Sequence, residues 1–170
     1  MTLSYWLGHS FFKLAARSLF NYRVINPERL DVPGGALVVC NHASFLDPPF
    51  VGVAFDDAIH YFAKKPLFDN PAVAAVLRSW NAIPVDQDRP DMGSVKTVIR
   101  LLKKQEKVLL FPEGSRSFDG IIAKGEPGTG LIVAKTHVPV IPVRIFGTHE
   151  ALPHDVHFIQ PSKITVVVGK

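Results

Sequence analysis

The chain has 170 residues, of which 47% are hydrophobic and 20% charged, with a formal net charge of +4. This length suits one domain with a single core, and this composition excludes an intrinsically disordered protein. Cys40 is the only cysteine, so an internal disulfide framework is excluded and a reducing compartment is expected. The positive charge favours an anionic partner, such as a phosphate group, acidic lipid or nucleic acid.

Residues 1–22 predict an amphipathic N-terminal helix. At 100° per residue, one broad face collects Leu3, Leu7, Phe11, Leu14, Ala15 and Leu19. Two interpretations are open: the helix covers the core of its own domain, or it lies in the interface of a membrane, which Trp6 and the Phe residues favour. No apolar stretch reaches the roughly 18 residues of a spanning helix, and the start lacks the features of a signal peptide.

Short apolar runs then alternate with helical patterns. The predicted strands are 36–40, 59–63, 82–85, 107–112, 138–146 and 163–169. Helices are predicted from Asp47, from Asn70 with Pro71 in its first turn, and over 93–105 and 129–136. We therefore expect one α/β domain over 23–170, with a mixed, largely parallel sheet flanked by helices and with functional loops at the carboxyl ends of its strands.

The loop NHASFLD at 41–47 follows the first of these strands. Across a turn, the Asp47 carboxylate can fix one ring nitrogen of His42 and leave the other free as a general base. Ser44 lies inside the same short loop and the chain has no G-x-S-x-G motif, so such a pair needs a substrate hydroxyl or water to activate. The alternative is structural, with Asp47 as a helix cap and His42 as an ordinary loop histidine.

A second polar loop, EGSRSFDG at 113–120, follows the strand KVLLFP. Gly114, Ser115 and Arg116 offer flexible backbone donors, a hydroxyl and a guanidinium, which together suit a phosphate group. The alternative is an ordinary polar turn. If both loops follow parallel strands, they open onto the same edge of the sheet.

Together the two loops resemble the glycerolipid acyltransferases typified by bacterial 1-acylglycerol-3-phosphate acyltransferase. NHASFLD matches that family's N-H-x-x-x-x-D block and FPEGSRS matches its F-P-E-G-T-R-S block, and the resemblance extends through 64–68, 81–86 and 138–148. It implies that His42 is the general base on the free hydroxyl of a lysophospholipid, with Asp47 as its orienting partner. The hydroxyl would attack an acyl thioester carried by coenzyme A or acyl carrier protein, with no other cofactor, in phospholipid biosynthesis.

The resemblance also implies substrate-binding residues. Glu113, Gly114, Ser115 and Arg116 would shape the pocket for the acceptor's phosphate, Asn41 would help to hold the loop, and Lys64 of the block KKPLF would contribute to the same pocket. From the amphipathic N-terminal helix and the lack of a spanning helix or signal peptide, we expect the protein at the cytoplasmic face of a membrane, as a peripheral or monotopic protein.

The sequence departs from the family pattern at several positions. Where the family commonly reads G-x-I-P-V-x-R, this chain has Asn81 and Gln87, with Arg89 as a candidate substitute for the missing Arg. GEPG at 125–128 replaces the common F-K-x-G. A different acceptor head group is therefore open. Relatives usually continue beyond Lys170, so the chain is either a compact member or a fragment.

Other functions fit these residues less well. A thioester hydrolase would use His42 to activate water in place of the acceptor hydroxyl. A peripheral lipid-binding module would not need the His42–Asp47 pair. A metal site could draw on His149, Glu150, His154, Asp155 and His157, but such a polar stretch between strands is usually a solvated loop, and no metal is predicted. No nucleic-acid partner is predicted either, because Lys103, Lys104 and Lys107 have no aromatic platform beside them and are expected to form a solvated face.

Overall fold

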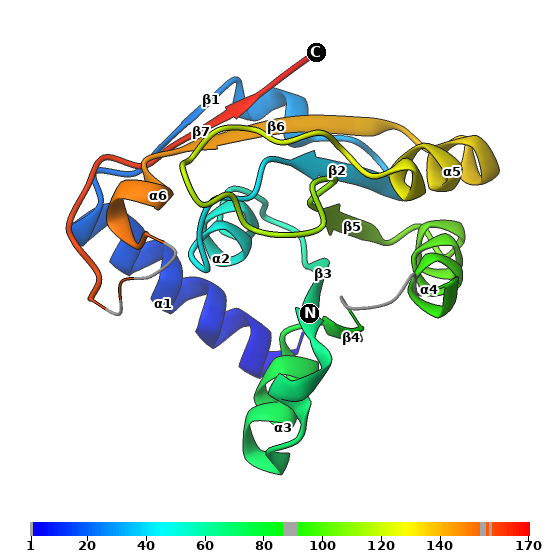
Figure 1. The fold of residues 1–170 in the computed structure, drawn as a ribbon, viewed down its shortest axis with the longest axis horizontal. Helices are drawn as coiled ribbons and strands as arrows, with labels where there is room; N and C mark the ends of the chain where they lie inside the picture. The colour runs from blue at the N-terminus through cyan, green and yellow to red at the C-terminus, as the bar shows by residue number, and fades with distance from the viewer. Residues whose placement is uncertain (1, 87–91, 154–155, 157) are drawn as a thin grey trace.

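A computed structural model describes residues 2–86, 92–153, 156 and 158–170 (Figure 1). Its helices are α1 (Leu3–Leu19), α2 (Asp47–Gly52), α3 (Pro71–Ser79), α4 (Met92–Lys103), α5 (Pro127–Thr136) and α6 (Thr148–Ala151), with 3₁₀ turns η1 (Pro27–Leu30) and η2 (Lys65–Phe68). Its strands are β1 (Arg23–Ile25), β2 (Ala36–Cys40), β3 (Ile59–Lys64), β4 (Ala82–Val85), β5 (Lys107–Leu110), β6 (Val140–Phe146) and β7 (Thr165–Val168).

The seven strands form one sheet in the order β1-β7-β6-β2-β5-β3-β4. All neighbouring strands run parallel except β6 and β7. The predicted class, a single α/β domain with a mixed, largely parallel sheet, is thus confirmed. The sequence prediction missed β1, because a run of three residues is too short to show a period of two. Strand β2 lies inside the sheet and is covered on both faces, which explains its uninterrupted apolar sequence ALVVC.

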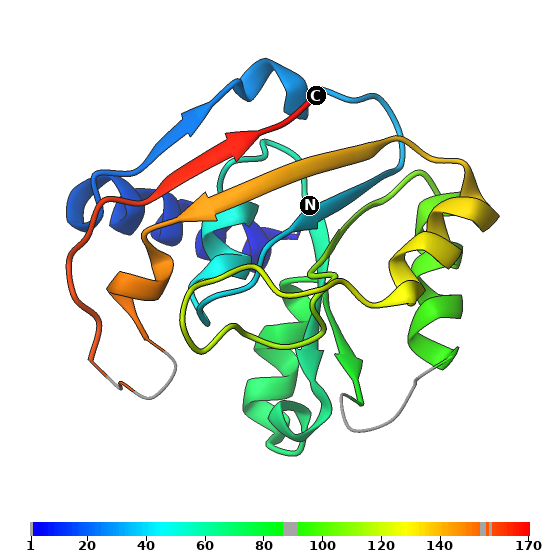
Figure 2. The same cartoon turned by 45° about the horizontal axis from the view of Figure 1, so that its top comes forward.

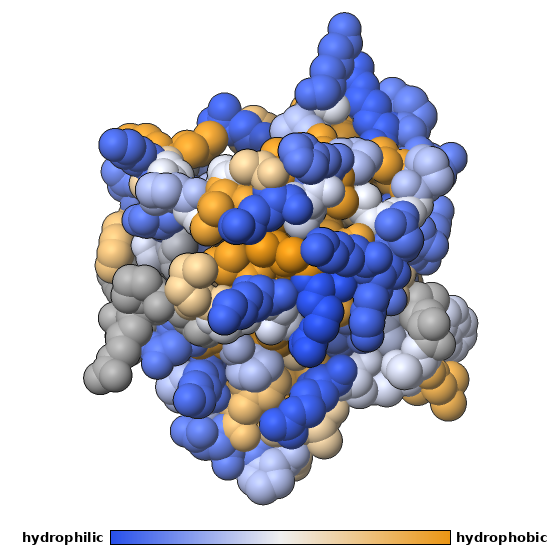
Figure 3. Space-filling model, turned by 90° about the vertical axis from the view of Figure 1, so that its right-hand side faces the viewer, coloured by the Kyte–Doolittle hydropathy of each residue, from blue (hydrophilic) through white to orange (hydrophobic). Residues whose placement is uncertain are grey.

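Helices cover both faces of the sheet (Figures 1 and 2). On one face, α1 and α2 pack on a core that includes Val38 of β2 and Phe50 of α2. On the other face, Leu37 of β2 packs with Val98 of α4 and Ile132 of α5. Successive residues of β2 therefore serve different cores, as the pleat of a strand requires. Figure 3 views the side of α4 and α5, where hydrophilic side chains surround a band of hydrophobic ones.

Two predicted helix starts are confirmed. Helix α2 begins at Asp47, with Pro48 and Pro49 in its first turn. Helix α3 begins at Pro71, and the Asn70 Oδ1 caps it by accepting the N–H groups of the second and third helical residues at 3.0 and 3.3 Å. A proline at the first helical position costs no hydrogen bond, because the N–H of any other residue there would have no partner inside the helix.

Lys107 is not part of a solvated face, contrary to the prediction. Lys103 and Lys104 are exposed, but Lys107 is buried, and its Nζ donates to Asp57 Oδ2 at 2.8 Å. The reason is topological. Lys107 is the first residue of β5, which lies between β2 and β3, so its backbone is inside the sheet and its charge needs a partner.

Helix α1 covers the core, but not with the face that its sequence suggested. Tyr5, Gly8 and Ala16 are its buried residues. Gly8 lets the helix approach closely, because a Cβ there would come within 2.6 Å of the Trp80 ring. The predicted apolar face points outward instead, with Leu14 67% exposed. Among the described residues, no helix is long and apolar enough to cross a membrane.

Candidate active site

The two polar loops meet at one edge of the sheet, as predicted. Strands β2 and β5 are parallel neighbours, and their register pairs Val39 with Leu110 near their carboxyl ends. The loops that follow them therefore leave the sheet together. The Ser117 N–H donates to the His42 carbonyl oxygen at 2.8 Å and joins the loops directly. In Figure 2 the yellow-green segment after β5 passes close to α2 on its way to α5.

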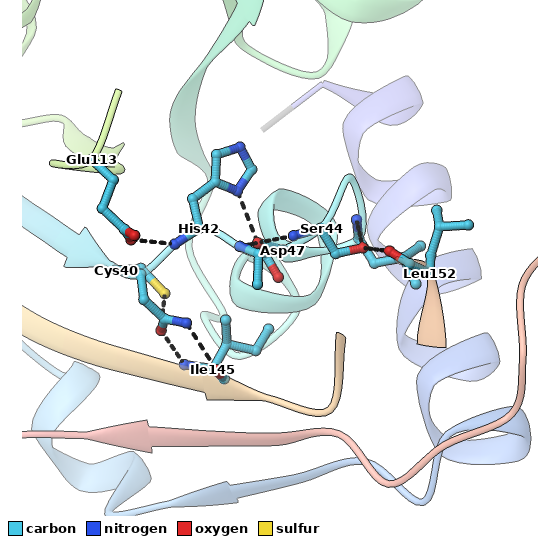
Figure 4. Close-up of polar contacts among 10 residues, drawn as sticks. Cys40, His42, Ser44, Asp47, Glu113, Ile145 and Leu152 are labelled. Carbon is cyan, nitrogen blue, oxygen red and sulfur yellow. Dashed lines mark hydrogen bonds and ion pairs between the residues drawn. The ribbon is translucent and has the colours of Figure 1, made fainter. Parts of the chain in front are cut away.

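His42 and Asp47 form a hydrogen-bonded pair between β2 and α2 (Figure 4). The Nδ1–H of His42 donates to Asp47 Oδ2 at 2.8 Å, and the second ring nitrogen points away from the carboxylate. Asp47 is completely buried, while the His42 side chain keeps 14% of its surface exposed. An anionic acceptor at Nδ1 fixes the tautomer of a neutral imidazole and leaves Nε2 unprotonated. Nε2 is then available as a base.

The same Asp47 oxygen also fixes the loop that carries His42. It accepts the Ala43 N–H at 2.6 Å and the Ser44 N–H at 2.7 Å. The sequence suggested Asp47 as a cap for the following helix, whereas these bonds run back to the preceding loop. A buried carboxylate is stable with several donors around it, and here those donors are also the residues that it must position.

Ser44 and Cys40, the potential nucleophiles nearest to His42 in the chain, are occupied or unreactive. The Ser44 hydroxyl is buried and donates to the Leu152 carbonyl oxygen at 2.9 Å. Burial raises the pKa of the Cys40 thiol, and the negative charges of Asp47 and Glu113 raise it further. A protonated, buried thiol is a poor nucleophile. The pair is therefore arranged to activate a hydroxyl or water that enters from outside.

Phe111 sets the plane of the His42 ring, a contact that sequence reasoning missed. The two rings stack with centroids 4.0 Å apart and planes inclined by 18°. Phe111 is the first residue of the motif FPEGSRS, so the sequence marks the position as notable. The sequence does not show that its ring contacts His42. Stacking restrains the imidazole while leaving its edge free for hydrogen bonds.

Glu113 and Asn41 hold the site through backbone groups. Glu113 accepts the His42 N–H at 2.7 Å through Oε1 and the Ala123 N–H at 2.8 Å through Oε2. The Asn41 side chain exchanges two bonds with the backbone of Ile145 on β6, at 2.8 and 3.1 Å. These contacts fit the loop-holding role expected for Asn41. For Glu113 they favour a role in positioning over direct contact with a phosphate.

Three of the predicted phosphate-binding residues line a pocket of about 450 Å³ that His42 also lines, whereas Glu113 and Gly114 are not among its described lining residues. Ser115, Arg116 and Lys64 contribute polar or positively charged groups to it. The Arg116 guanidinium carbon lies 3.5 Å above the Phe45 ring centroid, a cation–π arrangement that sequence reasoning did not anticipate. Gly114 has a φ of +71°, in the left-handed region that favours glycine, and so turns the chain sharply before Ser115.

The rest of the pocket wall is mainly apolar and extends to α1 and α3. Gly8 and Phe12 of α1, Leu77 of α3 and the adjacent Trp80 belong to it. Tyr5 also lines the pocket, and burial raises the pKa of its hydroxyl, which therefore stays uncharged. The pocket thus combines a base and cationic groups with a largely apolar wall that suits a hydrocarbon chain.

Two elements of the sequence prediction fall on residues that are not described. Arg89 lies outside the described residues, and so do His154, Asp155 and His157 of the stretch weighed as a metal site. Among the described residues, no three His, Cys, Asp or Glu side chains are grouped so that they could hold a metal ion.

Comparisons with known proteins agree with this site. The family model described as Acyltransferase matches residues 21–146. The 1-acyl-sn-glycerol-3-phosphate acyltransferase of Bacillus subtilis is 35% identical over 149 residues, which are 87% of this chain and 72% of that enzyme. A chloroplast enzyme of the same name from Arabidopsis thaliana is 31% identical over 145 residues, 82% of this chain but only 40% of its own length.

A solved structure is similar over nearly the whole chain. The crystal structure of the 1-acyl-sn-glycerophosphate acyltransferase PlsC from Thermotoga maritima matches with a TM-score of 0.85 and 28% identity, covering 98% of this chain and 67% of that one. The family model, the sequence relatives and this structure all identify the same fold and family. The chain belongs to the acyltransferase family.

Proposed function

We propose that this chain transfers a fatty acyl group from an acyl thioester to the free hydroxyl of 1-acylglycerol-3-phosphate. The observation that carries the proposal is the 2.8 Å hydrogen bond between His42 Nδ1 and Asp47 Oδ2 beside a largely apolar pocket. With Ser44 and Cys40 unavailable as nucleophiles, we assign the base to a hydroxyl of the substrate. The names of the similar enzymes from Bacillus subtilis, Arabidopsis thaliana and Thermotoga maritima support this acceptor.

The proposed reaction needs one base that later acts as an acid. His42 Nε2 takes the proton of the acceptor hydroxyl as that oxygen attacks the carbonyl carbon of the thioester. Asp47 holds Nδ1–H and stabilises the imidazolium. The tetrahedral intermediate then collapses, the C–S bond breaks, and the imidazolium returns the proton to the leaving sulfur. The products are a new ester and a free thiol, that of coenzyme A or of an acyl carrier protein.

The acceptor's phosphate is assigned to the cationic residues of the pocket. Arg116 supplies a planar fork for two phosphate oxygens, and Phe45 beneath it orients that fork. Ser115 and Lys64 line the same pocket and supply a hydroxyl and a second positive charge. This arrangement would place the phosphate near His42. Such a position is required because the reacting hydroxyl and the phosphate are attached to neighbouring carbons of the acceptor's glycerol.

The proposal extends to a membrane surface, because the outward face of α1 suits the interface of a lipid leaflet. Leu3, Leu7, Phe11 and Leu14 are all exposed on it. Apolar side chains of an amphipathic helix bury themselves at the boundary between head groups and acyl chains. We place the protein at the cytoplasmic face, as a peripheral or monotopic protein, where a lysophospholipid can be reached without leaving the leaflet.

Incubation of the purified protein with labelled acyl coenzyme A or labelled acyl carrier protein tests the activity. Lysophosphatidate, lysophosphatidylcholine and lysophosphatidylglycerol are offered as acceptors, with one reaction lacking any acceptor. We expect the label in phosphatidate, and the faster donor identifies the physiological thioester. Label released as free fatty acid in the reaction without acceptor would instead show a hydrolase. Lipid binding without either product would show a binding module.

A further inference from the structure

A second apolar surface lies on the segment between β5 and α5. Phe118, Ile121 and Ile122, which we call the loop tip, are 71%, 69% and 48% exposed. Three large apolar side chains within five residues are a costly surface to leave in water, and such patches commonly mark a contact with another molecule or with lipid.

The loop tip has a defined shape. At its start, the Ser117 N–H is bonded to the His42 carbonyl oxygen, and its end is held by the Glu113 carboxylate. Between them, Asp119 Oδ1 accepts the Ile121 N–H at 2.9 Å and the Ser117 hydroxyl at 2.8 Å. The first of these bonds, supported by the second, lowers the pKa of the Asp119 carboxyl. These hydrogen bonds fix the conformation of the loop, and in this conformation the side chains of the loop tip are exposed.

The loop tip and α1 border the same pocket from different elements. Phe118 lines the pocket together with Phe45, and both are exposed, so they lie where it opens. Gly8 and Phe12 line it from α1. The ring of Phe12 also contacts the ring of Phe11, which belongs to the outward face of α1, with centroids 5.5 Å apart. Exposed apolar surface thus adjoins the pocket on both elements.

We propose that the loop tip enters the interface of a lipid leaflet together with α1, so that the pocket opens directly onto lipid. The choice of lipid as the partner rests on the proposed function. An acceptor with one long acyl chain and an anionic head group resides in a leaflet, and an opening bordered by apolar surface lets it enter without crossing water.

Each of the two elements carries an exposed basic residue that suits an anionic leaflet. Lys124 follows Ile122 by two positions and Arg17 lies on α1, and both are exposed. Basic residues beside an inserted apolar segment bind acidic head groups. Two exposed acidic residues, Asp119 and Glu126, lie in the same segment. The Asp119 carboxylate is bonded to its own loop, which suits a position at the level of the head groups rather than among acyl chains.

A pair of double variants tests the proposal. Ile121→Ser/Ile122→Ser removes two side chains of the loop tip, and Ile25→Ser/Val140→Ser removes two exposed side chains from β1 and β6 as the matched control. Partition to vesicles of phosphatidylcholine and phosphatidylglycerol is measured by sedimentation. Turnover is measured separately with a short-chain, freely soluble lysophosphatidate, so that a failure of the proposed function is distinguishable from a failure of membrane contact.

We expect the loop-tip variant to bind vesicles at least about tenfold more weakly, since burying even one such side chain is worth that much. Its turnover on the soluble acceptor should equal that of the unmodified protein, and the control variant should bind vesicles normally. Unchanged vesicle binding by the loop-tip variant, or an equal loss in the control, would overturn the proposal.

A second measurement does not depend on removing the side chains. Because Cys40 is buried, an Ile121→Cys variant can be labelled at that position alone with a dye whose emission reports polarity. The proposal predicts a shift of the emission to shorter wavelength when vesicles are added. An emission that stays at its value in water, while the protein sediments with the vesicles, would show that α1 binds without the loop tip.

Discussion

Single residues in this site act largely through backbone N–H groups. Asp47 Oδ2 accepts one N–H from the His42 ring and two from the loop backbone. Each oxygen of Glu113 accepts one backbone N–H, one from His42 itself. The carboxylates of Asp47 and Glu113 therefore position the His42 imidazole without contacting the substrate. Substitutions of Asp47 and of Glu113 should have different effects.

Asp47→Asn should lower kcat by about two to four orders of magnitude. The amide oxygen can take the place of Oδ2 and accept the N–H groups of His42, Ala43 and Ser44, so the ring keeps its tautomer. The negative charge that stabilises the imidazolium is lost, however, and the NH₂ group takes the buried position of Oδ1, for which the described residues offer no hydrogen-bond partner. Single-turnover acyl transfer measures the loss, and the KM values should change little. Activity within tenfold of the unmodified protein would contradict this role.

Glu113→Gln should lower both kcat and stability. Glutamine has one acceptor oxygen, so either the His42 N–H or the Ala123 N–H would lose its partner, at a cost of about 1–3 kcal/mol. For a domain of this size that corresponds to a Tm lower by several degrees. KM for the acceptor should be nearly unchanged. A large rise in that KM at constant Tm would show instead that Glu113 contacts the acceptor.

Phe45→Leu should raise KM for lysophosphatidate severalfold, because the Arg116 guanidinium loses the ring 3.5 Å beneath it. Phe45→Tyr keeps an aromatic face and should restore the original value. Steady-state kinetics with both variants distinguishes orientation of Arg116 from a general loss of packing, since KM for the thioester and Tm should stay constant. A fall in kcat with constant KM would place Phe45 in a different role.

The sequence alone predicted the polar residues of the site better than its aromatic ones. His42 and Asp47 were recognisable because their spacing bridges a strand end and a helix start, and Arg116 because it follows a neighbouring strand. The contacts of Phe111 with His42 and of Phe45 with Arg116 were not predictable. They depend on how two loops, about 70 residues apart in the chain, pack against each other.

At the scale of elements, α1 has two apolar faces. Tyr5, Gly8 and Ala16 pack inward, while Leu7 and Phe11 point outward. A search for hydrophobic periodicity selects the outward face, because its side chains are larger. The inward face uses glycine and alanine to permit close approach, and it uses the Tyr5 hydroxyl to accept the Ile59 N–H at 3.1 Å. Small residues and a hydrogen-bonded tyrosine carry little hydrophobic signal, so sequence could not identify this face.

Replacing the outward face of α1 should separate membrane binding from folding. Leu7→Ser/Phe11→Ser/Leu14→Ser leaves the inward face intact, so we expect Tm to change by no more than a few degrees. Vesicle partition should fall at least about tenfold. Circular dichroism and sedimentation with anionic vesicles measure the two effects. A large loss of stability with unchanged vesicle binding would mean that this face covers protein rather than lipid.

At the scale of the whole molecule, the sheet brings the site together. The alternation of strands and helices predicted a largely parallel sheet, and parallel strands have their carboxyl ends at one edge, so the meeting of the two loops could be expected from sequence. The strand order and the antiparallel pairing of β6 with β7 could not, because both depend on contacts between distant segments. The hydrogen bond from the Ser44 hydroxyl to the carbonyl oxygen of Leu152, just beyond α6, could not be predicted for the same reason.

Acyl transfer by the His42→Ala variant tests whether His42 is the general base. Labelled acyl thioester and 1-acylglycerol-3-phosphate are mixed with excess protein, and labelled phosphatidate is followed through a single turnover. We expect the unmodified protein to form phosphatidate and the variant, still folded by circular dichroism, to be slower by a factor of about 10² to 10⁴. A variant that keeps more than about a hundredth of the rate, or an unmodified protein that releases only free fatty acid, would contradict this expectation.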